Sequence, residues 1–244
     1  MFVIYKVNNC FFLVRGGRDL NEKKIVGEKA TDFVKDGMVV GLGTGSTVYY
    51  TILKLGQLVK EGLSIQGIPT SIQTADLAKK MGIPLVSSHD IEQIDVVIDG
   101  ADEVDSHLNL IKGGGGALLR EKIIAKVAQQ FIVVATLDKL SKKLGSFPLP
   151  VEVVPFGAEW TAQHLEELRG QPSLRQINGK PYQTDNGNYI FDCRFPNVTQ
   201  PCELEISLNK IPGVIENGLF IGMADLVISL DEKNQPIFLK RGGK

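Results

Sequence analysis

Apolar residues recur at about helical spacing between residues 22 and 34, with lysines and acidic side chains between them. This period predicts an amphipathic helix over 22–34, which Asp36-Gly37 ends. The short apolar run Met38–Leu42 follows at once and has the character of a strand buried in a parallel sheet. A helix and a buried strand are therefore expected next to each other in this part of the chain.

The same alternation of amphipathic and apolar segments continues to residue 135. Strands that alternate with helices form a parallel sheet with right-handed crossovers, because each crossover helix packs back onto the sheet. The sequence therefore predicts an α/β fold. The expected segments are a helix after Thr47, strand Ser64–Ile68, helix Ala75–Met81, strand Pro84–Val86, strand Asp95–Ile98, helix Ala117–Gln129 and strand Phe131–Ala135.

The pattern changes after Leu144, where prolines flank a Val-Glu-Val-Val strand and two Asn-Gly dipeptides favour hairpin turns. We predict a small α+β domain over 146–218, inserted into a parallel-sheet, Rossmann-like α/β domain formed by 21–145 and 219–244. The expected segments are helix Ala158–Leu168, turns at Asn178-Gly179 and Asn186-Gly187, strand Tyr189–Phe195, helix Glu203–Leu208, a strand near Val214, and returning strands Leu226–Leu230 and Ile237–Lys240.

Residues 1–20 mix aliphatic and aromatic residues with Asn-Asn and Gly-Gly and show no sustained period. We predict that they form an N-terminal extension outside the fold. The alternative is a hydrophobic strand that pairs with a sheet edge, because disordered segments usually hold fewer aliphatic residues than this one.

Composition and charge exclude some classes of protein. Of the 244 residues, 43% are hydrophobic and 23% are charged, and the net charge is −1, so neither nucleic acid nor a membrane is an expected partner. No apolar run approaches the ~18 residues that span a bilayer, and no small-residue cleavage site follows the apolar N-terminal stretch. Cys10, Cys193 and Cys202 form no CxxC pair, which favours a reducing compartment. We expect a cytoplasmic protein that acts on a small molecule.

Lys112–Gly116 is the most distinctive segment, because a lysine and four consecutive glycines open a helix. Glycine costs conformational entropy, so such a run is expected where the backbone approaches a ligand closely or needs a positive φ. The free N–H groups, the helix N-terminus and the Lys112 charge together favour a developing oxyanion or a phosphate.

Glu121 lies one turn into that helix. At about 100° per residue, its side chain is turned toward small residues, whereas Lys122 and Lys126 mark the solvent face and Arg120 points into the apolar face. Burial would raise the pKa of Glu121 and Lys112 would lower it, and the sequence does not rank the two effects. Glu121 is a candidate general base. The alternative is a surface glutamate paired with a basic residue, although no charged residue stands at helical spacing from it.

A second glycine-rich turn, Gly41–Thr47, follows the predicted strand at 38–42 and opens the next helix. Its amides and hydroxyls could cradle a phosphate beyond the carboxyl end of the strand. A nucleotide P-loop would need a lysine where Gly45 stands, and a dinucleotide site would need a glycine at Ser46 and an acid after the next strand. The alternative is a tight turn with a hydroxyl helix cap.

Acidic residues follow the predicted strand at 95–98, in the sequence Asp99-Gly100-Ala101-Asp102-Glu103. Asp99 stands at the carboxyl end of that strand, where open α/β sheets bind ligands. The alternative is a helix cap with solvated neighbours. The spacing of the acids disfavours a calcium loop, and the three histidines neither cluster nor lie near a cysteine, so no metal site is expected.

Several motifs occur in a fixed order: GTGST at 43–47, DGADE at 99–103, KGGGG at 112–116 with REK at 120–122, and FPLPVEV at 147–153. Together they resemble the type A ribose-5-phosphate isomerase family, from about residue 21 to the C-terminus. The resemblance implies a cofactor-free aldose–ketose isomerase that interconverts ribose 5-phosphate and ribulose 5-phosphate in the pentose phosphate pathway. It also implies a homodimer or homotetramer, with 21–145 and 219–244 as the catalytic domain.

The resemblance assigns roles to individual residues. Glu121 matches the general base, which moves a proton between C2 and C1 through an enediolate, and Asp99 matches a residue that helps to open the sugar ring. Departures are small: Gly116 replaces a residue that is often alanine, Leu119 stands where threonine is common, and residues 1–20 have no counterpart. The matching substrate-binding residues are Lys23, Thr44, Gly45, Ser46 and Thr47 on the phosphate side, Asp99, Gly100, Ala101, Asp102, Lys112, Gly113, Gly114 and Gly115 around the sugar, and Lys139.

Other functions remain open. Sugar-phosphate sensor domains of some repressors share this architecture, although they carry a DNA-binding domain for which residues 1–20 are too short. A transferase that acts on coenzyme A thioesters could use a glutamate as its nucleophile. A nicotinamide dehydrogenase is disfavoured, because the acid that would hold the ribose is missing.

Overall fold

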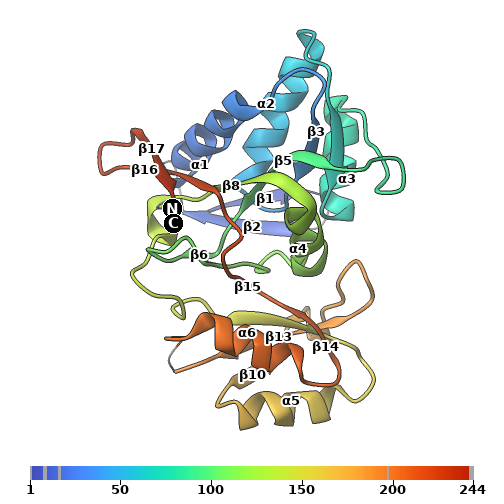
Figure 1. Ribbon diagram of the computed structural model, residues 1–244, viewed down its shortest axis with the longest axis vertical. Helices are drawn as coiled ribbons and strands as arrows, with labels where there is room; N and C mark the ends of the chain where they lie inside the picture. Colours follow the sequence, from blue (N-terminus) through green and yellow to red (C-terminus); the bar gives the residue numbers. More distant parts are fainter. Residues whose placement is uncertain (1, 8–9, 16–17, 197, 242–244) are drawn as a thin grey trace.

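The computed structural model describes residues 2–7, 10–15, 18–196 and 198–241. Two layered units are stacked along the long axis of the molecule (Figure 1). The larger unit is built on a six-stranded sheet of β3 (Val39–Leu42), β4 (Gln66–Pro69), β5 (Ile94–Gly100), β8 (Ala128–Val134), β16 (Leu226–Leu230) and β17 (Pro236–Lys240). The order is β17-β16-β8-β5-β3-β4, and all neighbours are parallel except the terminal hairpin β16–β17.

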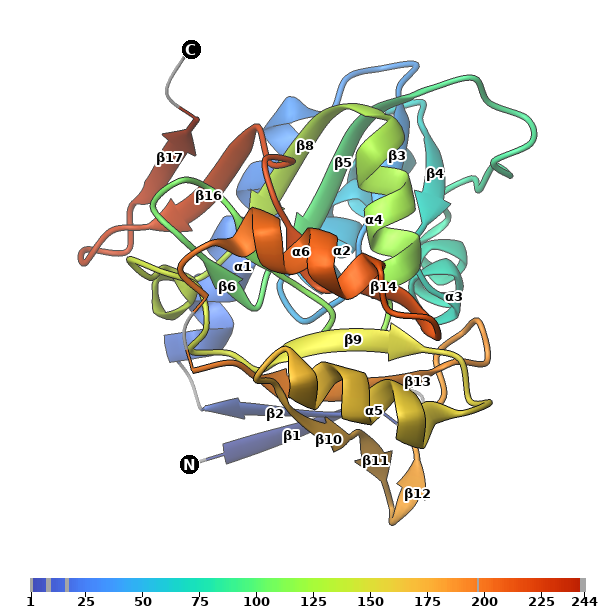
Figure 2. The ribbon, with the colours of Figure 1, turned by 60° about the horizontal axis from the view of Figure 1, so that its bottom comes forward.

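Helices cover both faces of this sheet, because its central strands are apolar on both sides. One face packs against α1 (Arg18–Lys29) with the 3-10 turn η1 (Ala30–Phe33), α2 (Val48–Lys60) and α3 (Ile72–Met81), and the other against α4 (Leu118–Val127), which lies in front of the sheet in Figure 2. Alternate residues of β3 face opposite sides. Leu42 belongs to the first core, whereas a Cβ on Gly41 would lie 3.0 Å from Ile124 of α4.

The smaller unit holds an antiparallel sheet in the order β10-β13-β9-β14. Its two helices contribute Leu165 and Leu208 to a core under this sheet. A short hairpin, β11–β12, turns at Asn178-Gly179 with positive φ at both residues, as the dipeptide predicts. The elements are β9 (Leu149–Val153), α5 (Ala158–Glu167), β10 (Gln171–Leu174), β11 (Gln176–Ile177), β12 (Lys180–Pro181), β13 (Tyr189–Arg194), α6 (Pro201–Asn209) and β14 (Val214–Asn217).

A three-stranded sheet joins the two units. It consists of β6 (Glu103–Val104), β7 (Leu110–Ile111) and β15 (Leu219–Phe220), with β7 in the middle. β15 leaves the smaller unit and pairs with β7, and Lys112 N donates a 2.9 Å hydrogen bond to Gly218 O. The returning chain is therefore fastened next to the lysine of the KGGGG run.

The predicted α/β class is confirmed by the parallel sheet, and the boundaries of several elements differ. α1 begins at Arg18 rather than at residue 22, and its last turn tightens into η1. α4 ends at Val127 rather than Gln129, because Ala128 already pairs with Ile94 as the first residue of β8. The predicted strand at 84–86 forms a single bridge from Leu85 to Gly67, since Pro84 has no N–H to donate to a sheet ladder.

At the N-terminus, β1 (Phe2–Val7) and β2 (Cys10–Arg15) form an antiparallel pair and bond to no other strand among those the structure describes. The alternative of a strand added to an existing sheet edge is therefore wrong for these residues. That 1–20 lie outside the fold, and that 146–218 form a separate domain, stay predictions. Residues 1, 8–9 and 16–17 lie outside the described residues.

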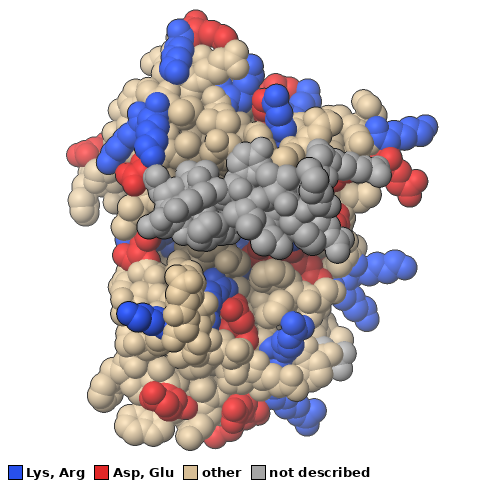
Figure 3. All heavy atoms as spheres, turned by 180° about the vertical axis from the view of Figure 1, so that it is seen from behind, with Lys and Arg blue, Asp and Glu red and all other residues tan. Residues whose placement is uncertain are grey.

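Basic and acidic side chains of the described residues are interspersed over the face shown in Figure 3, in keeping with the net charge of −1. Within the described part of the chain, no helix combines the length and the apolar character that a membrane crossing requires.

Substitution of Phe131 tests whether the apolar residues around β8 form the core of the larger unit. Its side chain is buried on β8, with its ring centroid 6.4 Å from that of Phe220. Phe131→Ala should lower the free energy of unfolding by about 3–5 kcal/mol, because it removes apolar contacts and leaves a cavity. Phe238→Ala, at a 43% exposed position of β17, should cost less than about 1 kcal/mol. Urea denaturation followed by circular dichroism measures both, and equal losses would contradict the assigned core.

Candidate active site

The carboxyl ends of β3, β4, β5 and β8 meet at one edge of the six-stranded sheet. The chain order reverses at β3, since β4 lies on one side of it and β5 on the other. Open α/β sheets bind ligands at such a point, because the loops that follow the two strands diverge and leave a crevice. The loops after β3 and β5 carry GTGST and DGADE, so the structure brings both motifs to this place.

Three charged side chains are buried together beside this edge. Lys112 Nζ lies 3.0 Å from Asp99 Oδ2 and 3.2 Å from Glu121 Oε2. It also donates a 2.5 Å hydrogen bond to Gly100 O. Each of the three charged side chains is at most 3% exposed. The loop after β5, the KGGGG run and helix α4 therefore converge on one ammonium group.

One lysine cannot neutralise two carboxylates, so this cluster has one excess negative charge when all three groups are ionised. Burial, together with the charge of Asp99, raises the pKa of Glu121 to about 8 in spite of the opposing charge of Lys112. Burial likewise raises the pKa of Asp99. For Lys112, burial alone would lower the pKa, but the two carboxylates outweigh it and raise it. A pKa raised to about 8 suits Glu121 to accepting and returning protons near neutral pH.

Two oxygens of this cluster have unused hydrogen-bonding capacity. Within the described residues, the Lys112 ammonium is the one polar partner of Asp99 Oδ2, at 3.0 Å, and of Glu121 Oε2, at 3.2 Å. A carboxylate oxygen can accept more than one hydrogen bond, so each of these buried oxygens has room for a further donor. They thus mark the side of the cluster where a substrate hydroxyl could bind.

Asp99 also fixes the first glycine-rich turn. Its Oδ1 accepts hydrogen bonds from Thr44 N at 3.0 Å and from Gly100 N at 2.7 Å. The carboxyl group packs directly on Gly43, where a Cβ would lie 2.2 Å from Oδ1. Only glycine lets the turn and the aspartate come this close.

Four hydroxyl groups gather at the same edge. The Thr44 hydroxyl lies 2.7 Å from Thr70 Oγ1, 2.8 Å from Ser71 Oγ and 3.1 Å from Thr74 Oγ1. Ser71 caps α3, because its Oγ accepts a 3.0 Å hydrogen bond from Thr74 N. The starts of α2 and α3 therefore meet at one polar cluster.

Both glycine-rich turns present backbone N–H groups there. Those of Gly45, Ser46 and Thr47 donate to no acceptor among the described residues, and they open α2, whose dipole favours an anion. In the KGGGG run, Gly114 N donates a 2.7 Å hydrogen bond to Asp102 Oδ2. A Cβ on Gly115 would lie 3.5 Å from Thr44 Cγ2, so the two turns are neighbours.

The two remaining predicted lysines lie on the elements around the cluster. Lys139 ends the 3-10 turn η2 (Leu137–Lys139) after β8, with Nζ 3.8 Å from Asp138 Oδ2. Lys23 lies on α1, one turn before Gly27, where a Cβ would be 2.5 Å from Thr47 O. The helix face that carries Lys23 is therefore packed toward the start of α2.

Two side chains of α4 differ from the expectation. Lys122, expected on the solvent face, is only 11% exposed and lies 2.7 Å from Glu216 of β14. Arg120, expected in the apolar face, donates hydrogen bonds to Asn186 Oδ1 at 2.9 Å and Asp185 O at 3.0 Å. Both expectations are wrong because the smaller unit packs against α4, and the helical period of α4 alone contains no information about it.

The segment 184–188 connects the two units. Asp185 Oδ2 accepts a 2.7 Å hydrogen bond from Ile72 N at the start of α3, and Arg120 of α4 binds the same segment. The segment is held by Glu152, a buried residue of β9. The Oε1 atom of Glu152 accepts hydrogen bonds from Thr184, Asn186 and Asn188, at 2.9, 3.2 and 2.9 Å.

Sequence reasoning missed the hydroxyls of Thr70, Ser71 and Thr74, although a signal was present. They form a Thr-Ser-x-x-Thr pattern directly after a strand and at the start of a helix, which is typical of an N-cap. The contacts of Glu152 and Arg120 had no comparable signal, since they join segments far apart in the sequence.

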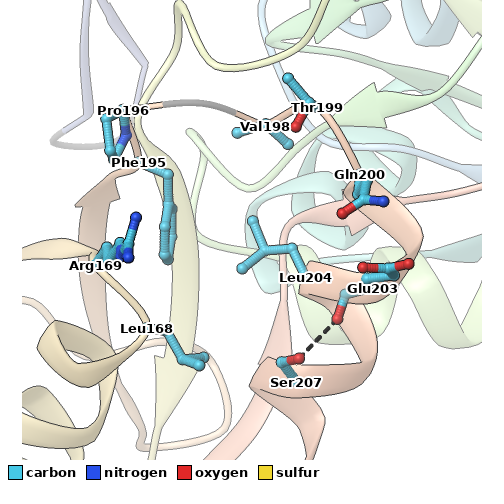
Figure 4. Close-up of a pocket in the computed structure, with 10 residues that line it drawn as sticks. All are labelled: Leu168, Arg169, Phe195, Pro196, Val198, Thr199, Gln200, Glu203, Leu204 and Ser207. Atoms are coloured by element: carbon cyan, nitrogen blue, oxygen red, sulfur yellow. Dashed lines mark hydrogen bonds between the residues drawn. The ribbon is translucent and has the colours of Figure 1, made fainter.

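A separate hollow of about 260 Å³ lies in the smaller unit, between the end of α5, the end of β13 and the start of α6 (Figure 4). Arg169 and Glu203 are among its lining residues, and none of the predicted site residues is. Within the described part of the chain, no three His, Cys, Asp or Glu side chains are grouped so that they could hold a metal ion.

Comparison with known proteins places the chain in a family. A family model described as ribose 5-phosphate isomerase A (phosphoriboisomerase A) matches residues 66–234. Ribose-5-phosphate isomerase A of Bacillus mycoides (strain KBAB4) is 50% identical over 210 residues, which cover 86% of this chain and 95% of the relative. Its counterpart in Listeria monocytogenes serovar 1/2a is 48% identical over 223 residues, 91% of this chain and 100% of the relative.

Solved structures agree with this assignment. A D-ribose-5-phosphate isomerase in complex with phospho-erythronic acid matches with a TM-score of 0.88 and 43% identity, over 93% of this chain and 100% of that one. Ribose 5-phosphate isomerase A from Methanocaldococcus jannaschii matches with a TM-score of 0.86 and 43% identity, over 92% and 100%. The chain belongs to the ribose 5-phosphate isomerase A family.

Proposed function

We propose that the chain interconverts ribose 5-phosphate and ribulose 5-phosphate with Glu121 as the general base. Membership of the family supports the reaction. The observation that carries the mechanism is the buried Glu121 carboxyl, 3.2 Å from Lys112. Moving a proton between adjacent carbons needs a base that reaches both and an electrophile for the oxyanion, and these two groups meet both needs.

Glu121 takes the proton from C2 of the open-chain aldose. The electron pair of that C–H bond forms the C1–C2 double bond, and the carbonyl π electrons move to O1, which gives an enediolate. Glu121 then returns the proton to C1, while the proton of the O2 hydroxyl moves to O1 and O2 becomes the ketone oxygen. Protons and electrons balance within the substrate, so the proposal needs no cofactor.

The surrounding groups act on the oxygens. The Lys112 ammonium and the N–H group of Gly115 stabilise the oxyanion, since they are held in place before charge develops. Asp99 and Asp102 hold sugar hydroxyls. The raised pKa of Asp99 lets it exchange a proton with the ring oxygen when the sugar opens.

The substrate phosphate binds to the turn Thr44–Thr47, with Lys23 and Lys139 as further cations. The free N–H groups at the start of α2 support this assignment. A relative was solved in complex with phospho-erythronic acid, a phosphorylated sugar acid. An acid of this kind carries a phosphate at one end and an oxyanion at the other, which are the two groups that the proposed site would bind.

We also propose that the protein is a cytoplasmic homodimer or homotetramer and has no nucleic-acid or membrane partner. The net charge of −1 and the sequence resemblance support these statements. Size-exclusion chromatography with light scattering measures the number of chains in the assembly, and a monomeric mass would contradict the proposal.

The reaction is tested by incubating the purified full chain with ribose 5-phosphate alone, in the presence of EDTA, and measuring ketose formation. An isomerase forms ribulose 5-phosphate without any second substrate. A sensor domain or a transferase acting on coenzyme A thioesters would form none. Activity that disappears with EDTA and returns with added metal would contradict the metal-free mechanism.

Glu121→Gln should reduce kcat by roughly 10²–10⁴-fold or more, because the amide cannot take the C2 proton. The affinity for phospho-erythronic acid, measured by calorimetry, should stay within about tenfold, since the lost interaction acts mainly in the transition state. Glu232→Gln, at an exposed turn position, is the matched control and should keep full activity. Substantial turnover by the Glu121 variant would assign the base to another residue.

The rate should depend on pH through Glu121. The base acts in its ionised form, and its pKa is raised to about 8, so the active fraction falls about tenfold for each pH unit below that value. Between pH 7 and 8 kcat/KM should therefore rise, and it should level off above about pH 8.5. A profile measured with the stability of the fold checked at each pH tests this, and a kcat/KM that is flat or falls from pH 7 to 8 would contradict it.

A further inference from the structure

We propose that Arg175, a residue of the smaller unit, is a positioning residue that sets the peptide planes of the KGGGG run. The inference rests on the proposed isomerase function for its kinetic consequences. Arg175 follows β10, and its guanidinium is bound by both oxygens of Asp192 on β13: Nε lies 2.9 Å from Oδ2 and Nη2 lies 2.5 Å from Oδ1. This bidentate pair fixes the guanidinium in one plane.

The remaining nitrogen of the guanidinium reaches the glycine run. Nη1 of Arg175 donates hydrogen bonds to Gly113 O at 3.0 Å and to Gly114 O at 3.2 Å. One cationic group therefore binds two successive carbonyl groups. Lysine could not make this arrangement while also binding Asp192 in a bidentate manner, because it has no planar fork of donors.

The two hydrogen bonds to carbonyl groups also fix the directions of the N–H groups that follow them, because each peptide unit is planar. In a planar trans peptide the C=O and the following N–H point in opposite directions. With Gly113 O held by Arg175, Gly114 N points away from it and donates to Asp102 Oδ2 at 2.7 Å. With Gly114 O held as well, Gly115 N also points away from Arg175, and it has no acceptor among the described residues. Arg175 thereby turns an unused donor toward the substrate side.

Tyr182 completes the support from the smaller unit. Its ring centroid lies 5.8 Å from Arg175 Cζ, within the range of a cation–π contact. Its hydroxyl oxygen covers Gly116, where a Cβ would lie 2.1 Å from it. The run is thus held by the smaller unit on one side and by Asp102 on the other.

Four consecutive glycines have no side chains that could hold their peptide planes. Within the run, the one hydrogen bond among the described residues joins Gly116 N to Gly113 O at 3.0 Å, and it does not hold the peptide plane between Gly114 and Gly115. The support for that plane comes from outside the run. If the contacts of Arg175 are lost, the N–H groups of the run remain but no longer point in a fixed direction. A misplacement of about 1 Å in a catalytic site can cost 10²-fold in rate. Because the donors act on charge that develops in the transition state, the loss should fall on kcat more than on KM.

The experiment compares Arg175→Ala with Arg194→Ala, an exposed arginine on the neighbouring strand β13. Arg175→Ala should lower kcat for ribose 5-phosphate roughly 10- to 100-fold and change KM less than about threefold. Guanidinium chloride at a concentration too low to unfold the protein should restore part of the lost kcat. Arg194→Ala should keep wild-type kinetics with or without guanidinium. Arg175→Lys should be intermediate, and it provides the kinetic test if the alanine variant does not fold.

Hydrogen–deuterium exchange of the peptide that contains residues 113–118 provides a readout independent of turnover. Its amides should exchange faster in Arg175→Ala than in the wild type, and equally in Arg194→Ala. Unchanged exchange, or a loss confined to KM, would overturn the role of Arg175. If the wild type itself forms no ketose, the proposed function fails, and the exchange result alone then decides whether Arg175 orders the run.

Discussion

The burial of Lys112 between Asp99 and Glu121 is the interaction on which the site depends. Removing one member of a buried ion pair commonly costs about 3–5 kcal/mol, because a charge is left without a partner. Here a single ammonium is shared by two carboxylates, at 3.0 and 3.2 Å. The cluster therefore holds three chain segments together. It also raises the pKa of Glu121 to about 8, so that this carboxyl group can bind and release a proton near neutral pH.

The two units contribute differently to this arrangement. The parallel sheet brings the loops after β3 and β5 to one edge, which is a property of its strand order. The smaller unit supplies partners for side chains around the cluster: Glu216 for Lys122, Asn186 for Arg120, and Arg175 for the glycine carbonyls. Its contacts end on α4 and on the KGGGG run, the two segments that carry Glu121 and Lys112.

The sequence alone predicts those helices, strands and turns whose hydrophobic period or turn residues lie within one short segment. Patterns within a dozen residues predict strands at 38–42 and 95–98, found at 39–42 and 94–100, and the hairpin turn at Asn178. They also turn Glu121 toward small residues, and the structure buries it. The orientation of Lys122 and Arg120 did not follow, because their partners lie 94 and 66 positions away. The sequence also did not show whether burial or the Lys112 charge has the larger effect on the pKa of Glu121. Desolvation depends on every segment that excludes water from the carboxyl group, so only the folded structure decides it.

The hydrogen bond from Ile72 N to Asp185 joins residues 113 positions apart, and the pairing of β7 with β15 joins the middle of the chain to residues 219–220. Helices α2 and α3 precede these partners in the order of synthesis. A nascent chain that has left the ribosome as far as α4 already contains Asp99, Lys112 and Glu121, but it lacks the segments that hold the surrounding loops. These contacts around the crevice therefore form late in biogenesis, after residues 219–220 have been translated.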